Sequence, residues 1–322
     1  MSLRLDAVEG LGEVVPGTDL GAMIVEHADL ADGDVVVVTS KVVSKALGLA
    51  TTQDRDAVVA AATVRVVAER GPTRIVRTVQ GLTMAAAGVD ASNTEPGTVI
   101  PLPLDPDAEA RAIRARVRTL SGRTVAVVVS DTAGRAWRTG QTDIAIGCAG
   151  LVPVESFAGR TDTHGNPLAV TAPAVADEVA GAAELASGKL GGRPVVVVRG
   201  VSAHLLTEED GPGAVALQRP DGEDLFGLGA RDAVVAAVAA VRGDADPVGF
   251  PVDPTVTLEH VVALADTGDL EVEVDGSTVR LTAPGTWPLM VELGRLVERI
   301  GVLAVAHELD VDIAVVGRSP DA

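Results

Sequence analysis

Apolar and polar residues follow one another in blocks along the chain, and the blocks predict a mixed α/β protein. Runs made almost entirely of Val are typical of strands, and "RPVVVVRG" is apolar enough to be buried on both faces. Amphipathic runs, two of them opening at an Asp that can cap a helix, are typical of helices. The helices are expected at 19–31, 54–70, 105–120 and 172–190, and the strands at 35–40, 73–79, 124–129 and 193–200.

The chain changes character near residues 241–254, which are rich in Gly, Pro and Asp and are typical of a linker. The residues that follow predict a helix at 255–268, a hairpin with an Asp-Gly turn at 270–283, a helix at 287–301 and a strand at 311–317. We therefore expect a main domain at 1–247 and a small α/β extension of unknown role at 248–322.

Composition narrows the function classes. Of the 322 residues, 47% are hydrophobic but only 2% are aromatic, so the core must be built from small aliphatic side chains. The formal net charge of −19 repels phosphate backbones and anionic membranes. We expect no nucleic-acid or membrane partner, and an anionic ligand would require local basic clusters or metal ions.

A single cysteine, Cys148, excludes an intrachain disulfide and suits a reducing compartment. Within "IAIGCAGL" it is expected to be a small packing residue rather than a nucleophile. The N-terminus has no signal-peptide pattern, and no apolar run reaches the roughly 18 residues of a membrane span. The sequence therefore predicts a soluble cytoplasmic protein.

The usual nucleotide-binding motifs are absent. "ASGKLGG" lacks the Ser/Thr and the first Gly of a Walker A loop, and no strand is followed by G-x-G-x-x-G. "VTSKVVSK" (38–45) offers hydroxyl and ammonium groups at a strand end that could hold phosphate oxygens. The alternative is an ordinary helix N-terminus that Ser40 caps, with solvated lysines. The candidate phosphate ligands are Ser40, Lys41, Ser44 and Lys45.

"SDTAGRAWRTGQTD" (130–143) is unusually polar for a segment that directly follows a Val-rich strand. Asp131 is expected at the strand end, where open α/β sheets commonly bind ligands. A carboxylate there suits Mg²⁺ or Mn²⁺ bridging nucleotide phosphates, and Arg135 and Arg138 could complement the remaining charge. Gly134 and Gly140 would allow tight turns. The alternative is a solubilising turn.

Two further polar segments contain candidate ligands. In "AGRTDTHGNPLAVT" (158–171), Asp162 could share a metal with Asp131, whereas His164 is expected to be an ordinary turn residue. In "GVDASN" (88–93), Asp90, Ser92 and Asn93 could line a site or simply form turns. We find no Ser/His/Asp or Cys/His arrangement and no zinc-ligand spacing.

The chain resembles the coenzyme F420-0:L-glutamate ligase (gamma-glutamyl ligase) family over roughly residues 5–230. The most specific motif is "SDTAGRAWRTGQTDIAIGCAG"; the others are "VVVVTSKVVSK", "GLTMAAAGVDASN", "LPLDPD" and "GNPLAVTAPAVADEVAGAAEL". The resemblance implies a GTP-dependent ligase with a two-domain α/β (mixed α+β) fold particular to the family. Such an enzyme joins L-glutamate to the deazaflavin coenzyme precursor through an acyl phosphate, as a homodimer using Mg²⁺ or Mn²⁺, with K⁺ as an additional candidate ion.

The resemblance also implies roles for particular residues. Asp131 and Asp162 would be metal ligands, with Thr163 beside a second ion. Arg135 and Arg138, chosen for the charge that they could offer to phosphate, are the candidate catalytic residues. The residues expected to contact GTP are Leu11, Gly12, Glu13, Ser40, Lys45 and Gly134.

The chain also departs from the family pattern. Leu47 and Leu49 stand where a Glu and an Arg are usual, and "VTA" (170–172) replaces "VTE". These departures concern the acceptor pocket, so a paralogue that acts on another carboxylate is one alternative and a non-catalytic nucleotide-binding protein is another. Some related ligases are fused to a flavin-binding domain of about 200 residues, for which the extension here is too short, so FMN is not expected.

Overall fold

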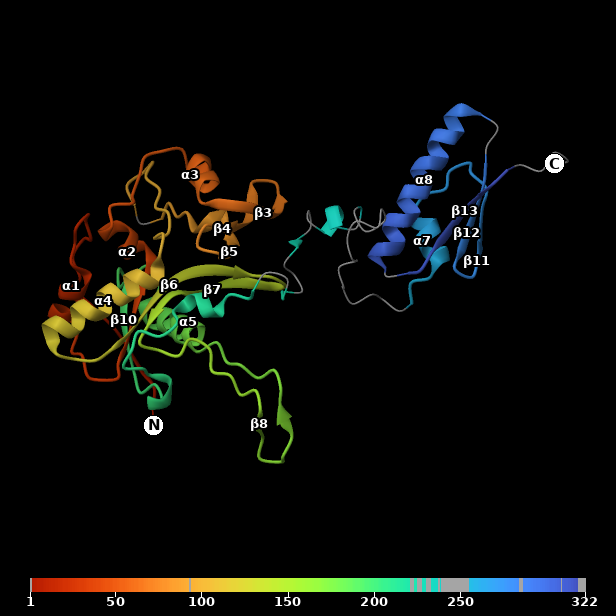
Figure 1. The fold of residues 1–322 in the computed structure, drawn as a ribbon. Coiled ribbons are helices and arrows are strands. Elements are labelled where there is room, and N and C mark those ends of the chain that lie inside the picture. Colours follow the sequence, from red (N-terminus) through yellow and green to blue (C-terminus); the bar gives the residue numbers. More distant parts are fainter. Residues whose placement is uncertain are drawn as a thin grey trace. The chain divides into compact units, whose positions relative to one another are not determined.

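A computed structural model describes residues 2–92, 94–220, 255–283, 286–307 and 309–317, with a few positions between 223 and 238. The chain divides into two compact units, Met1–Pro220 and Asp221–Ala322. The division expected at 247/248 and the linker expected at 241–254 lie outside the described residues, so both remain predictions. Figure 1 shows mixed α/β structure in each unit, as the sequence predicts.

The N-terminal unit is built on a five-stranded sheet with strand order β1-β10-β2-β6-β7. Only β2 and β6 pair in parallel, and the other neighbours are antiparallel. The strands are β1 (Arg4–Ala7), β2 (Val35–Thr39), β6 (Ala126–Arg135), β7 (Arg138–Ala149) and β10 (Val195–Arg199).

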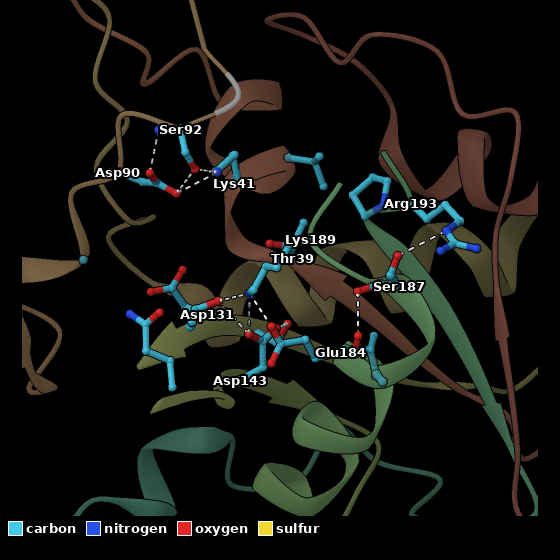
Figure 2. Close-up of a pocket in the computed structure, with 18 of the residues that line it drawn as sticks. Thr39, Lys41, Asp90, Ser92, Asp131, Asp143, Glu184, Ser187, Lys189 and Arg193 are labelled. Atoms are coloured by element: carbon cyan, nitrogen blue, oxygen red, sulfur yellow. Dashed lines mark hydrogen bonds and ion pairs between the residues drawn. The ribbon is translucent and has the colours of Figure 1, made fainter. Parts of the chain in front are cut away.

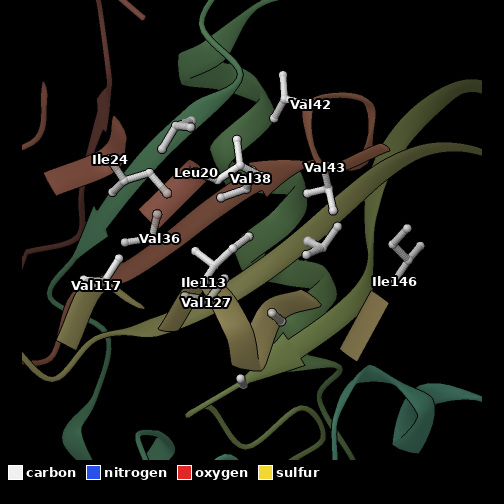
Figure 3. Close-up of a cluster of buried hydrophobic side chains, with 14 of the residues drawn as sticks. Leu20, Ile24, Val36, Val38, Val42, Val43, Ile113, Val117, Val127 and Ile146 are labelled. Atoms are coloured by element: carbon white, nitrogen blue, oxygen red, sulfur yellow. The ribbon is translucent and has the colours of Figure 1, made fainter. Parts of the chain in front are cut away.

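Valine side chains from alternate positions fill both faces of this sheet, because successive residues of a strand point to opposite sides. Val36, Val38 and Val127 pack on one face against helices α1 (Leu20–His27) and α4 (Pro106–Ser121), as Figure 3 shows. Residues such as Val35 and Val128 pack on the other face against α5 (Val175–Ser187). The prediction of a core made from small aliphatic side chains is confirmed.

Asp side chains begin α1 and α4 as expected. Asp19 and Asp105 accept hydrogen bonds from backbone N–H groups of the first turn, at 3.0 and 2.8 Å. A Pro in the first turn and a left-handed Gly122 after the last residue complete α4. The helix expected at 172–190 is shorter, and α5 ends at Ser187 with a Gly that has positive φ.

The single helix predicted at 54–70 is wrong. Only α3 (Arg55–Ala61) is helical, and β3 (Thr63–Arg70) continues as a strand that pairs antiparallel with β4 (Thr73–Thr78) across a turn at Gly71. The β-branched residues of "TVRVV" favour a strand once such a partner is present, and the pairing depends on tertiary context. With β5 (Thr83–Ala85) these strands form a separate three-stranded sheet, followed by the short turn η1 (Ala86–Gly88).

The strand predicted at 124–129 is much longer than expected. β6 continues to Arg135 and pairs with β7 through a two-residue turn that contains Trp137. Asp131 therefore lies within a strand and not at its end, which corrects the prediction from sequence. The last residue of β2, Thr39, pairs with Ser130 of β6. Beyond Ser130, the two-stranded β6–β7 ribbon continues without β2 beside it. Polar residues are tolerated there because the ribbon leaves the core.

The C-terminal unit has a core of its own. α7 (Leu258–Leu264) and α8 (Trp287–Ala306) pack with a sheet of order β11-β12-β13 around residues such as Leu281 and Leu296. The strands are β11 (Val272–Asp275), β12 (Thr278–Thr282) and β13 (Asp312–Val316). The predicted hairpin, helices and final strand are confirmed. In the described part of the chain, no helix is long and apolar enough to cross a membrane.

Leu296→Ala tests whether the two units are independently stable. The side chain of Leu296 is fully buried in the C-terminal core, so its truncation should destabilise that unit by about 2 to 5 kcal/mol. Hydrogen–deuterium exchange should become faster in peptides from 255–317 and stay unchanged in the central sheet. Leu264→Ala, at a position 65% exposed, is the control and should change little. Faster exchange throughout both units would contradict independence.

Candidate functional site

A cleft of about 1000 Å³ opens where β2 ends and the β6–β7 ribbon continues (Figure 2). Its volume is large enough for a nucleotide together with a second ligand. Five segments of the N-terminal unit line it. They lie within residues 11–14, 37–45, 84–92, 130–143 and 183–196, with Arg55 in addition.

The Asp131 carboxylate is fixed at the centre of this cleft. The Ser40 hydroxyl donates a hydrogen bond of 2.7 Å to Asp131 Oδ1. Ser40 is buried and is the first residue of α2 (Ser40–Ala46), which follows β2 without a loop. Thr39 and not Ser40 is the N-cap residue, so the alternative in which Ser40 caps the helix is wrong.

Burial of Asp131 makes its negative charge unfavourable in the free protein. Desolvation raises the pKa of this carboxyl to about 6, and the nearby charges of Asp143 and Asp90 add to the increase. The hydrogen bonds from Ser40 and from the Thr132 backbone oppose it without cancelling it. A cation bound at this carboxylate would remove the penalty.

The α2 side of the cleft holds two lysines in ion pairs. Lys41 Nζ lies 2.6 Å from Asp90 Oδ2 and donates to Ser92 Oγ at 2.7 Å. Burial alone would raise the pKa of Asp90, but its bonds with Lys41 and Ser92 lower it overall. Asp90 also accepts the Ser92 backbone N–H at 2.6 Å, so this Asp both forms a turn and lines the cleft. Asn93 lies outside the described residues.

Most of the residues expected to contact GTP come together here. Lys45 Nζ donates to Glu13 Oε1 at 2.7 Å, which connects α2 to the loop before α1. Gly134 lies on the exposed part of β6. The cleft is lined by Leu11, Gly12, Glu13, Lys45 and Gly134, and Ser40 adjoins it through Asp131.

The α5 side of the cleft contains functional candidates that sequence reasoning missed. Asp143 on β7 is buried, and it accepts hydrogen bonds from Ser130 Oγ at 3.0 Å and Thr132 Oγ1 at 2.7 Å. Lys189 Nζ in turn donates to Thr132 Oγ1 at 2.7 Å and pairs with Glu184. The segment "ASGKLGG" does not match a phosphate-binding loop, so no motif points to Lys189. Asp143 comes opposite Thr132 only through the β6–β7 pairing, which local sequence does not reveal.

Arg135 and Arg138 do not line the cleft. They face each other across the last pair of the β6–β7 ribbon, at its exposed tip. The guanidinium groups are therefore separated from Asp131 along the strand, and the catalytic role expected for them remains a prediction.

Asp162 and Thr163 lie on a different projection. The short strands β8 (Arg160–Thr161) and β9 (Pro167–Leu168) form an arm that extends away from the central sheet (Figure 1). Asp162 accepts backbone N–H groups from His164 and Asn166 at 2.8 and 2.9 Å, and the bond from the Asn166 side chain lowers its pKa most. Neither residue lines the cleft of the same chain, so their expected metal roles remain predictions.

The residues at Asp131 fit a weakly chelated divalent ion. Among the described residues, no group of three or more His, Cys, Asp or Glu side chains could hold a metal ion by itself. Mg²⁺ commonly uses one or two carboxylates and completes its shell with water and substrate phosphates. The Asp131 carboxylate could hold such an ion beside a phosphate chain.

Cys148 takes no part in this site. It is buried in the core below α5, and burial together with the charge of Asp107 raises the pKa of the thiol to about 12. A thiol with this pKa stays protonated and unreactive, which agrees with the packing role expected from the sequence.

The raised pKa of Asp131 predicts that the free energy of unfolding decreases as the pH rises. Its pKa is higher in the folded than in the unfolded chain, so ionisation destabilises the native state as the pH rises from about 4 to above 6. In EDTA, Asp131→Asn should gain stability relative to wild type by about 2 kcal/mol between pH 4.5 and 7.5, from the shift in pKa and 1.36 kcal/mol per unit. Urea unfolding at both pH values measures this change, and a stability difference that is independent of pH would contradict it.

Known proteins similar to this chain carry consistent names. The family model described as F420-0:Gamma-glutamyl ligase matches residues 10–64 and 53–200. A coenzyme F420:L-glutamate ligase of Methanopyrus kandleri is 37% identical over 248 residues, which cover 70% of this chain and 98% of the relative. Proteins of the same name from Methanosarcina barkeri and Archaeoglobus fulgidus are 35% and 37% identical, covering 72% and 63% of this chain and 97% and 89% of those relatives.

Proposed function

The chain belongs to the F420-0:gamma-glutamyl ligase family, and from this premise we propose that it adds L-glutamate to the deazaflavin coenzyme F420 precursor in a GTP-dependent reaction. The names of its relatives support glutamate ligation in coenzyme F420 biosynthesis. The main support for a GTP-dependent reaction is the composition of the cleft. The residues expected to bind GTP line it or adjoin it, and they surround the Asp131 carboxylate, which Ser40 holds in position.

The proposed reaction has two steps. An oxygen of the acceptor carboxylate attacks the γ-phosphorus of GTP, which forms an acyl phosphate and releases GDP. The glutamate amine then attacks the acyl carbon, so that the amide bond forms, inorganic phosphate leaves and the amine loses a proton. Catalysis of this kind depends mainly on positioning and on neutralisation of phosphate charge.

The residues of the chain would divide this work between them. Lys45 and the backbone at Leu11, Gly12 and Glu13 would bind and orient the nucleotide. Asp131, oriented by Ser40, would hold Mg²⁺ or Mn²⁺, which when bound offsets charge on the transferred phosphoryl group. K⁺ is an additional candidate ion, with no residue assigned to it.

Asp131→Asn should abolish ligation and leave the fold intact. Asn is nearly isosteric and can still accept the Ser40 hydroxyl, but it lacks the charge that holds a hard cation. Loss of the metal should lower the rate on the order of a thousandfold or more. Mass spectrometry of the deazaflavin product after incubation with GTP, glutamate and Mn²⁺ measures this rate.

Asp29→Asn is the matched control for this substitution, because Asp29 is exposed and does not line the cleft. It should ligate at the wild-type rate. A near wild-type rate for Asp131→Asn would contradict the metal-ligand assignment. GTP turnover by the wild type that needs both acceptor and glutamate would separate the ligase from a non-catalytic nucleotide-binding protein.

The position of Asp162 supports a homodimer in which each chain completes the site of the other. If Asp162 and Thr163 are metal ligands together with Asp131, their place on an arm outside the cleft requires that they come from a second copy. The arm is suited to this because its own turn bonds hold the Asp162 carboxylate in one orientation.

Mixed dimers test this arrangement. Asp131→Asn and Asp162→Asn chains should each be inactive alone. A mixture that exchanges subunits should recover up to about a quarter of wild-type activity, because half of the dimers then contain one intact site out of two. Activity that stays at the level of the separate variants, with subunit exchange confirmed by native mass spectrometry, would contradict contribution of the arm by a partner chain.

No observation favours a paralogue that acts on another acceptor. The residues that depart from the family pattern, Leu47, Leu49 and Ala172, do not line the cleft. The ligase is therefore the function that the site supports best.

A further inference from the structure

Lysine is rare in this chain, and every lysine lines the cleft. The sequence contains 26 Lys and Arg residues, of which only Lys41, Lys45 and Lys189 are lysines. All three line the same cavity, together with Arg55 and Arg193. A Lys ammonium is a compact point charge and an Arg guanidinium is a broad planar fork, so the two are not interchangeable in a confined site. Lys189, which has no role in the GTP site described above, is therefore a candidate for binding a second ligand.

The surroundings of Lys189 combine both signs of charge. Its ammonium donates to Thr132 Oγ1 at 2.7 Å, pairs with Glu184 and lies 3.6 Å from Asp143 Oδ1. Burial works against its charge, but the two carboxylates raise the pKa of Lys189 overall. Figure 2 shows Lys189 among these residues. The side chain is nonetheless 60% exposed, so one face of this charged cluster is open to a ligand.

A second cation lies on the glycine-rich loop that follows α5. Arg193 Nε donates to the Ser187 carbonyl at 3.1 Å, which holds the guanidinium at the cleft wall. A Cβ at Gly191 would come within 2.6 Å of Arg193 Nε and 3.0 Å of the Ser187 carbonyl oxygen. Glycine at position 191 therefore lets the arginine lie across the loop.

We propose that this α5 side of the cleft is the subsite for L-glutamate, in which Lys189 and Arg193 bind its carboxylates and Asp143 and Glu184 bind its ammonium group. Adjacent groups of opposite charge complement a zwitterionic amino acid, which itself carries both signs of charge. The inference rests on the proposed function, because that function supplies an amino acid as substrate.

The sheet explains how this subsite can lie next to the phosphoryl group. Asp131 and Thr132 are consecutive in β6, so their side chains point to opposite faces from Cα atoms about 3.8 Å apart. Asp131 bonds to Ser40 on the α2 side, and Thr132 bonds to Lys189 on the α5 side. Because β2 ends before this point, the cleft passes around the free edge of β6 and joins the two sides. An amine bound at Asp143 and Glu184 would then lie near the acyl phosphate.

Steady-state kinetics with Lys189→Gln tests the subsite. The KM for L-glutamate should rise at least tenfold, and the KM for GTP should stay within twofold of wild type. Lys45→Gln is the contrasting variant from the α2 side and should instead raise the KM for GTP. Lys189→Arg should not restore the wild-type KM for glutamate, because the space between Thr132, Asp143 and Glu184 fits a compact ammonium. An unchanged KM for glutamate, or an equal rise for GTP, in Lys189→Gln would overturn the proposal.

A binding measurement keeps this test separate from the proposed function. If the wild type forms no glutamylated product, the ligase assignment fails, and the subsite is judged by calorimetric titration of L-glutamate in the presence of Mg²⁺ and a non-hydrolysable GTP analogue. Binding by the wild type that is lost in Lys189→Gln would support the subsite. Equal binding by both proteins, or none by the wild type, would overturn it. Should Lys189→Gln fail to fold, Arg193→Gln is judged by the same criteria.

Discussion

One hydrogen bond, from the Ser40 hydroxyl to the Asp131 carboxylate, joins helix α2 to strand β6 at the cleft. The parallel pairing of β2 with β6 brings Thr39 opposite Ser130, so the residue that follows each of them lies at the same edge. There β2 turns into α2, while β6 continues with β7 alone. The bond therefore fixes a partly desolvated carboxylate at the point where the sheet opens into a cleft.

The charges of the cleft follow from the strongly acidic composition of the chain. The net charge of the chain is −19, and each cleft lysine is paired with at least one carboxylate. The cleft consequently supplies cations at fixed positions without a large positive field. A triphosphate would still need further neutralisation, and under the proposed function the Asp131 carboxylate would hold the divalent ion that provides it.

Much of the fold could be predicted from local patterns, because Val-rich strands and Asp-capped helices carry their signals within a few residues. The β3 strand and the extension of β6 were missed, since each depends on an antiparallel partner that local propensity does not reveal. Asp131 and Lys45 were found from residue type and resemblance. Asp143 and Lys189 were not, because they join the site through cross-strand pairing and the loop after α5. The turn at Asp162 was expected from the polar residues of 158–171, but its separation from Asp131 on an arm was not.

The central claim is that the cleft binds the nucleotide through an ion held at Asp131. The most direct test of this claim is whether GTP binding depends on metal. Isothermal titration calorimetry would compare the affinity of the wild type for GTP in Mg²⁺ and in EDTA, with Asp131→Asn measured under both conditions. The account predicts at least tenfold tighter binding with Mg²⁺ for the wild type and little or no effect of Mg²⁺ for Asp131→Asn. Equal affinity of the wild type for GTP in Mg²⁺ and in EDTA would contradict it.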